Sequence, residues 1–207
     1  MSDYSVKRKE AYQKKFRRFG SSPKALQWYS KKAQIIRFLK FVQYLDISHH
    51  SVLDIGCGFA DIIPILRNRF VDFTYTGVDL VPEFIAIAKE RYPECSFFTK
   101  DYLKNPFVRK FDYILCSGVL NGNLGNPEFT MQYRLRAIRV MFSHCYLSLA
   151  FNMAGANPQP KNHPNSKIYY ADSNVIKGFG SVLTPNYIFI KDYQPKDFTC
   201  IMSHSPF

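Results

Sequence analysis

Apolar residues form two kinds of pattern along the chain: short continuous runs, which are typical of buried strands, and stripes at helical spacing. The runs predict strands over 51–55, 73–79, 96–98, 111–116, 145–151, 186–190 and 198–202. The stripes between them predict helices over 62–70, 82–92, 128–142 and 171–183. Strands that alternate with helices indicate a mostly parallel sheet, and the last two strands have no helix between them. We therefore expect a doubly wound α/β fold with a seven-stranded, mostly parallel sheet and an antiparallel strand pair at one edge.

The segment before the first strand has a different character. Residues 1–20 are polar and basic, and we expect a partly ordered arm there. Ser22 and Pro23 predict the start of a helix, with Ser22 as the N-cap and Pro23 in the first helical position. We therefore expect a basic arm and a cap helix over 1–47, and one domain over 48–207.

The formal net charge of +12 is distributed unevenly. Residues 1–40 hold 12 Lys/Arg and 2 Asp/Glu, a net charge of +10, which leaves +2 for all later residues. An enzyme that binds nucleic acid across its whole body is therefore disfavoured. Residues 7–18 either form a solvated face or hold the phosphates of an RNA.

Several classes of protein are disfavoured by what the sequence lacks. It has no run of about 18 apolar residues, and its first residues do not resemble a signal peptide. Its five cysteines are scattered, and its histidines do not have the spacing of metal ligands. We therefore expect a cytoplasmic protein that binds neither a membrane nor a metal.

The strongest chemical signal is a glycine turn after the first strand. Asp54 precedes Gly56 and Gly58, whose lack of a side chain allows a ligand to approach the backbone. A dinucleotide-binding turn would have a third glycine at position 61, which is Asp61 here. A carboxylate at the start of the following helix repels a pyrophosphate. The turn therefore favours S-adenosylmethionine (SAM), which carries an amino group and a sulfonium but no phosphate.

This turn resembles motif I of the class I SAM-dependent methyltransferases, with Ala60 in place of a glycine. Segments 75–80, 97–102 and 111–121 resemble the next three strands of that Rossmann-like fold, in order. The resemblance implies that Asp79 bonds the ribose hydroxyls and that Asp101 accepts from the adenine amino group. The residues expected to bind the cofactor are Asp54, Gly56, Gly58, Asp79, Leu80, Asp101, Tyr102, Ser117, Trp28 and Arg37. The outer segments resemble a group of poorly characterised bacterial methyltransferases.

Candidates for contact with the methyl acceptor follow the fourth and fifth strands, because ligands bind beyond the carboxyl ends of such strands. Asn121 and Asn152 are expected to orient the acceptor as catalytic residues, or else to cap local backbone. Trp28 and Arg37 are expected to cover the site, with Arg37 holding a carboxylate. Alternatively, this helix only packs on the edge of the sheet.

Three functions remain open at this point. The near-neutral body favours a methyltransferase that acts on a small-molecule acceptor. An RNA or ribosomal-protein methyltransferase would use the basic arm, but the Asn-Pro-Pro-Tyr/Phe motif of many such enzymes is replaced by 117–120, which reads Ser-Gly-Val-Leu. A non-catalytic SAM-binding protein is the third possibility.

Overall fold

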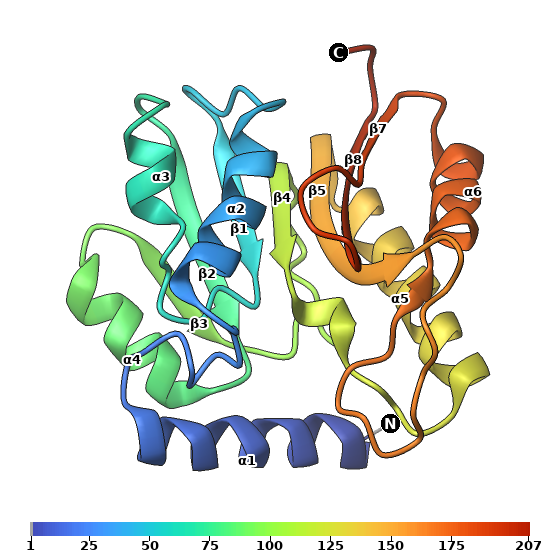
Figure 1. Cartoon of the computed structure of the whole chain (residues 1–207). Coiled ribbons are helices and arrows are strands. Elements are labelled where there is room, and N and C mark those ends of the chain that lie inside the picture. The colour runs from blue at the N-terminus through green and yellow to red at the C-terminus, as the bar shows by residue number, and fades with distance from the viewer. Residues whose placement is uncertain (1) are drawn as a thin grey trace.

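The molecule is built on one mixed sheet (Figure 1). In the computed structural model, residues 2–207 are described, with side chains from residue 5 onward. The strand order is β3-β2-β1-β4-β5-β8-β7, and the short β6 pairs with β5. The strands are β1 (Ser51–Ile55), β2 (Thr74–Asp79), β3 (Ser96–Thr99), β4 (Phe111–Ser117), β5 (Cys145–Ala156), β6 (Ala171–Asp172), β7 (Tyr187–Ile190) and β8 (Asp197–Ser203).

The predicted topology is confirmed. Strands β1 to β5 run parallel to one another, whereas β8 is antiparallel to both β5 and β7. The reversed strand β8 therefore lies one place inside the edge, which β7 forms. The helices are α1 (Ser2–Phe19), α2 (Lys31–Val42), α3 (Ile63–Arg67), α4 (Pro82–Arg91), α5 (Pro127–Ser143) and α6 (Ser173–Leu183), with a 3-10 turn η1 (Val119–Asn121).

Helices cover both faces of the sheet, as expected for a doubly wound fold (Figure 1). Alternate residues of a strand face opposite sides, so Val52 packs beneath α2, α3 and α4, whereas Leu53 packs toward α5 and α6. Helix α2 contributes Phe38, Phe41 and Val42 to the first of these two cores. Because α2 is part of that core, the division of the chain after residue 47 stays a prediction.

The N-terminal segment differs from expectation in two ways. Residues expected to form a partly ordered arm form α1, which lies across the carboxyl ends of the strands (Figure 1). The helix start predicted at Ser22 and Pro23 is wrong, because turns precede α2. Helix α2 instead begins after Ser30, whose side chain accepts a hydrogen bond of 3.1 Å from the N–H of Ala33.

Within residues 2–207, no helix combines the length and the apolar character needed to cross a membrane.

Candidate functional site

The glycine turn lies between β1 and α3, against the end of β2. Gly56 and Gly58 have φ angles of +75° and +56°, a region that residues with a side chain rarely adopt. A Cβ on Gly58 would lie 2.9 Å from a methyl carbon of Leu26, and a Cβ on Gly56 would clash with Val119. The N–H of Gly58 donates to Asp79 Oδ2 at 3.0 Å. Glycine is therefore required at both positions, and the turn is joined directly to one predicted cofactor acid.

Asp79 ends β2, and Asp101 lies two residues beyond the end of the neighbouring parallel strand β3, which places both acids at the same edge of the sheet. Asp79 also accepts from the N–H of Val81 at 3.0 Å. Burial raises the pKa of Asp79, while the N–H groups of Val81 and Gly58 and the charge of Arg8 oppose that rise. The two acids therefore lie close enough to serve one ligand, and their contacts with a ribose and an adenine stay predictions.

Asp54 is the third acid of this group, but its surroundings are different. It is buried on β1 and accepts a hydrogen bond of 2.6 Å from the hydroxyl of Tyr75 on β2. Burial raises the pKa of Asp54 to about 7, the Tyr75 hydrogen bond lowers it, and the charge of Asp79 raises it further. The Asp54 carboxyl therefore holds β1 and β2 together, and its contact with a cofactor stays a prediction.

Leu80 and Tyr102 follow the two cofactor acids and behave differently from one another. Leu80 is half-buried beside Asp79. The Tyr102 side chain is buried in the core, where its ring lies 5.7 Å from that of Phe107. Burial raises the pKa of Tyr102 to about 12. A cofactor would therefore meet Tyr102 through its backbone.

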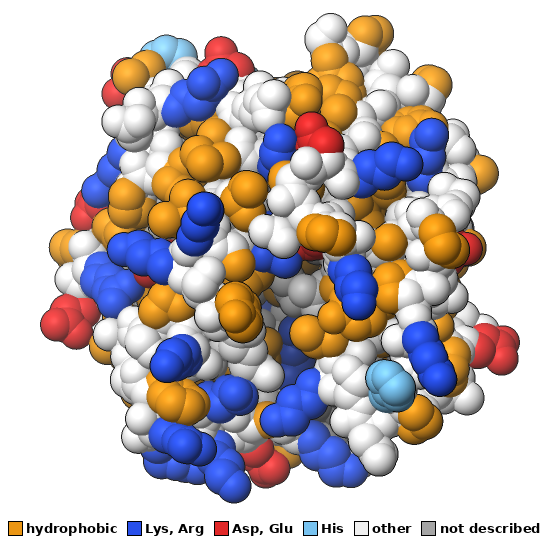
Figure 2. Space-filling model, viewed as in Figure 1, with side chains coloured by type: hydrophobic (Ala, Val, Ile, Leu, Met, Phe, Trp, Pro, Cys, Tyr) orange, Lys and Arg blue, Asp and Glu red, His pale blue; other side chains and the backbone are white. Residues whose placement is uncertain are grey.

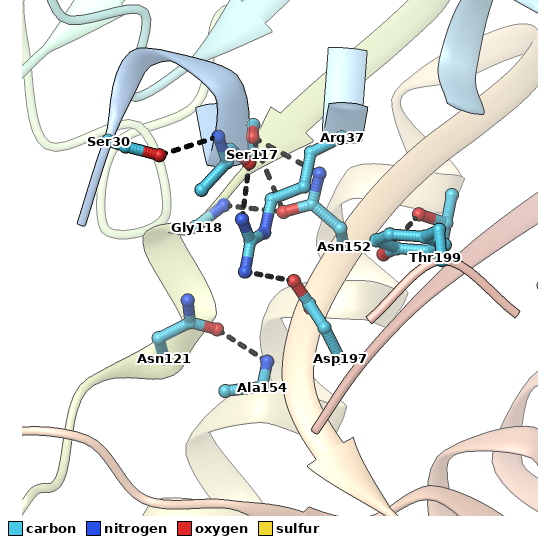
Figure 3. Close-up of polar contacts among 11 residues, drawn as sticks. Ser30, Arg37, Ser117, Gly118, Asn121, Asn152, Ala154, Asp197 and Thr199 are labelled. Carbon is cyan, nitrogen blue, oxygen red and sulfur yellow. Dashed lines mark hydrogen bonds and ion pairs between the residues drawn. The ribbon is translucent and has the colours of Figure 1, made fainter. Parts of the chain in front are cut away.

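The predicted catalytic residues Asn121 and Asn152 lie beyond β4 and within β5 (Figure 3). Asn152 is fully buried, and its Oδ1 accepts from the N–H of Gly118 at 3.0 Å. Its Nδ2 donates to Ser117 Oγ at 3.1 Å. The Oδ1 of Asn121 accepts from the N–H of Ala154 at 2.8 Å. These contacts match the backbone-capping alternative, and a role of either amide toward an acceptor stays a prediction.

Arg37 reaches the same region from α2. Its guanidinium lies 5.0 Å from the centre of the Trp28 ring and forms an ion pair with Asp197 (Figure 3). The Trp28 ring in turn covers Gly118, where a Cβ would lie 3.1 Å from it. Trp28 lies in the turns before α2, so the expected cap is made by these turns together with α2.

Asp197 is a site residue that the sequence analysis missed. It begins β8 and is buried; burial raises its pKa to about 7, whereas the charge of Arg37 lowers it. No local pattern identifies its partner, because Arg37 lies far away in sequence. The only available signal was an acid at the start of an apolar strand.

The structure thus brings the predicted residues into two adjoining groups. Asp54, Gly56, Gly58, Asp79 and Asp101 surround the ends of β1 to β3. The second group surrounds the ends of β4 and β5 and consists of Trp28, Arg37, Ser117, Asn121 and Asn152.

The central part of the chain matches a known family. Residues 52–139, less than half of the chain, match the family model described as a methyltransferase domain. The matched segment and the fold are similar to those of the class I SAM-dependent methyltransferases. The resemblance to this class is therefore confirmed over residues 52–139, which match a methyltransferase domain.

Known proteins show similarity of the same kind. A putative methyltransferase, 235L, of Invertebrate iridescent virus 6 is 31% identical over 90 residues, which are 42% of this chain and 34% of that protein. The match thus spans about a third of that relative. Magnesium protoporphyrin IX methyltransferase from Synechocystis PCC 6803, with bound S-adenosylhomocysteine (SAH), superposes with a TM-score of 0.61 and 16% identity over 81% of this chain and 82% of that one. SAM-bound CalS10, an amino pentose methyltransferase from Micromonospora echinaspora, superposes with a TM-score of 0.62 and 12% sequence identity. This match covers 84% of this chain and 90% of that one.

Proposed function

We propose that this chain is a SAM-dependent methyltransferase that acts on a small-molecule acceptor in the cytoplasm. The observation that carries the proposal is the glycine turn tied to Asp79, with Asp101 at the end of the neighbouring strand. In this arrangement the Asp79 carboxylate would bond the ribose hydroxyls, and Asp101 would accept from the adenine amino group. The glycine turn and the two acids suit a ligand that carries no phosphate, because their carboxylates would repel one.

The chemistry requires mainly positioning from the protein. SAM held by these residues would supply an electrophilic methyl group; the acceptor's nucleophile would bond to the methyl carbon from the side opposite the sulfur as the C–S bond breaks and SAH leaves. The chain's own residues would hold the partners in line and exclude water. Trp28 and Arg37 would close the site above Gly118, while Asn152 holds the Gly118 backbone in place.

Two observations support a small acceptor. The body beyond residue 40 is nearly neutral, so it does not attract a polyanion. Beyond β4, the Trp28 ring also packs against Gly118 and occupies part of the space at this edge of the sheet. The CalS10 and magnesium protoporphyrin methyltransferases are named for small-molecule acceptors. All five cysteines are free thiols, which fits a reducing compartment.

One observation favours a second candidate, an RNA or ribosomal-protein acceptor. Basic side chains gather along the lower edge of the molecule, at the position of α1 (Figure 2). On α1, Lys7, Lys14, Arg17 and Arg18 are exposed. Such a basic helix face would hold phosphates if the acceptor were an RNA.

Transfer of a labelled methyl group distinguishes these candidates. We expect label from methyl-labelled SAM to enter the small-molecule fraction of a cell extract, and the Asp79→Ala variant to transfer none. Label in RNA or in protein would contradict the small-molecule acceptor and favour the second candidate. Tight SAM binding with no transfer to any fraction would instead indicate a non-catalytic SAM-binding protein.

A further inference from the structure

Helix α1 docks on the two segments that flank the predicted cofactor acids. The ring of Tyr12 lies 5.9 Å from that of Phe84, and the ring of Phe16 lies 6.1 Å from that of Phe59. Phe59 directly follows the glycine turn, and Phe84 lies in the first turn of the helix after Asp79. These contacts hold α1 across the carboxyl ends of β2 and β3.

Ser5 contacts one of the cofactor acids directly. Its hydroxyl donates to Asp101 Oδ2 at 2.8 Å, and the ammonium of Lys104 lies 3.4 Å from the same oxygen. Both contacts use Oδ2, so an adenine amino group would approach Oδ1. The hydroxyl of Ser5 therefore fixes the orientation of the carboxylate that is expected to recognise adenine.

Arg8 lies between Ser5 and Tyr12 on the same face of α1, because residues three and four positions apart are neighbours on a helix. Its positive charge lowers the pKa of two groups on the strands that α1 crosses. Burial raises the pKa of the Cys116 thiol on β4, and the charge of Arg8 lowers it, as it also does for Asp79 on β2. Arg8 thus lies on the face of α1 that contacts Asp101 through Ser5 and Phe84 through Tyr12, and its guanidinium lies 5.8 Å from the centre of the Tyr12 ring.

A nearby cation favours the carboxylate form of Asp79, which is the form expected to bind the ribose. As a carboxylate it can accept hydrogen bonds from both ribose hydroxyls, but burial favours its neutral form. The Asp54 carboxyl on β1 also acts on Asp79, and a negative charge on Asp54 disfavours ionisation of Asp79; burial raises the pKa of the nearby Cys57 thiol and keeps that thiol neutral. Arg8 on α1 supplies charge of the opposite sign.

We propose that α1 is a wall of the cofactor site, in which Ser5 orients Asp101 and Arg8 keeps Asp79 negatively charged. Both are positioning residues, since they act through the two acids. The inference rests on the proposed function, because it assumes that SAM and SAH bind at Asp79 and Asp101. It adds a role for a helix whose basic character otherwise indicates only a solvated face or a binding site for phosphates.

Calorimetric titration with SAH, at about pH 6 and about pH 8.5, tests this role. We expect Arg8→Gln to weaken SAH binding roughly tenfold at the lower pH, because loss of the Arg8 charge raises the pKa of Asp79 further and favours its neutral form. At the higher pH the carboxylate form of Asp79 is more favoured in both proteins, so the loss should be smaller, under about threefold. Arg8→Lys should restore most of the affinity. Ser5→Ala should weaken binding by about threefold to tenfold at both pH values.

Lys14→Gln is the matched control, because it removes the same charge from the exposed face of α1. It should leave SAH affinity unchanged. If Arg8→Gln causes an equal loss at both pH values, or if Lys14→Gln causes the same loss, Arg8 acts only on structure or net charge, and the inference is overturned. If the unaltered chain does not bind SAH at all, the proposed function fails as well.

Discussion

Gly56 lies in the left-handed region of backbone conformation, with Val119 packed where a side chain would begin. Substitution therefore affects both the backbone and the packing against η1. The same residue lies beside the predicted cofactor position, so folding and ligand binding both require a residue without a side chain there.

Gly56→Ala is predicted to lower the free energy of unfolding by about 2 kcal/mol, because an L-residue is strained at this φ and its Cβ displaces Val119. Guanidinium denaturation measures the change. Gly178→Ala is the control, since Gly178 lies in α6 with open space around it. That substitution should raise stability by about 0.5–1 kcal/mol. A Gly56→Ala variant as stable as the unaltered chain would contradict the account.

Single residues of the site were predictable where they follow a strand. Asp79 and Asp101 could be placed together because the carboxyl ends of parallel strands meet at one edge. The pairing of Arg37 with Asp197 could not be predicted, since only the folded sheet brings α2 close to the start of β8. Asp54 was predicted to face the cofactor, but its bond to Tyr75 depends on the pairing of β1 with β2.

At the scale of elements, Asn152 connects β5 to the turn after β4. It is fully buried and satisfies the N–H of Gly118 and the hydroxyl of Ser117. Its amide therefore sets the position of the backbone over which Trp28 packs. This contact fits a structural contribution to the site.

Asn152→Ala is predicted to lower the free energy of unfolding by about 2–3 kcal/mol, because it leaves buried polar groups without partners. Urea denaturation measures the loss. The exposed Asn68 provides the control, and Asn68→Ala should change stability by less than about 0.5 kcal/mol. Unchanged stability of Asn152→Ala would mean that the amide does not hold the turn, and would favour direct contact with the acceptor.

The strands were predicted more accurately than the N-terminal helices, for a physical reason. Buried strands are continuous apolar runs, whereas α1 is rich in charged residues and has only a few apolar ones. Only Tyr12, Phe16 and Phe19 mark its inner face, and their partners lie on distant segments. The start of α2 was predicted too early. Ala25 and Leu26 pack beside Phe59 and Gly58, and this packing holds the residues before α2 in turns.

Over the whole molecule, the basic N-terminal helix and the near-neutral sheet occupy separate places in the fold. The near-neutral sheet carries the glycine turn and the acids, and the basic helix α1 lies across their open ends. Helix α1, where the sequence predicted a partly ordered arm, is therefore in contact with the proposed cofactor site through Ser5. Its exposed side remains available for an anionic partner.

Binding of SAM tests the central claim most directly. Calorimetry should show that one SAM binds per chain, with a dissociation constant on the order of micromolar, and that saturating SAM raises the melting temperature. Asp79→Ala should abolish both effects, whereas Asp72→Ala, which removes an exposed acid just before β2, should preserve them. Absence of heat together with an unchanged melting temperature at saturating SAM would contradict the account.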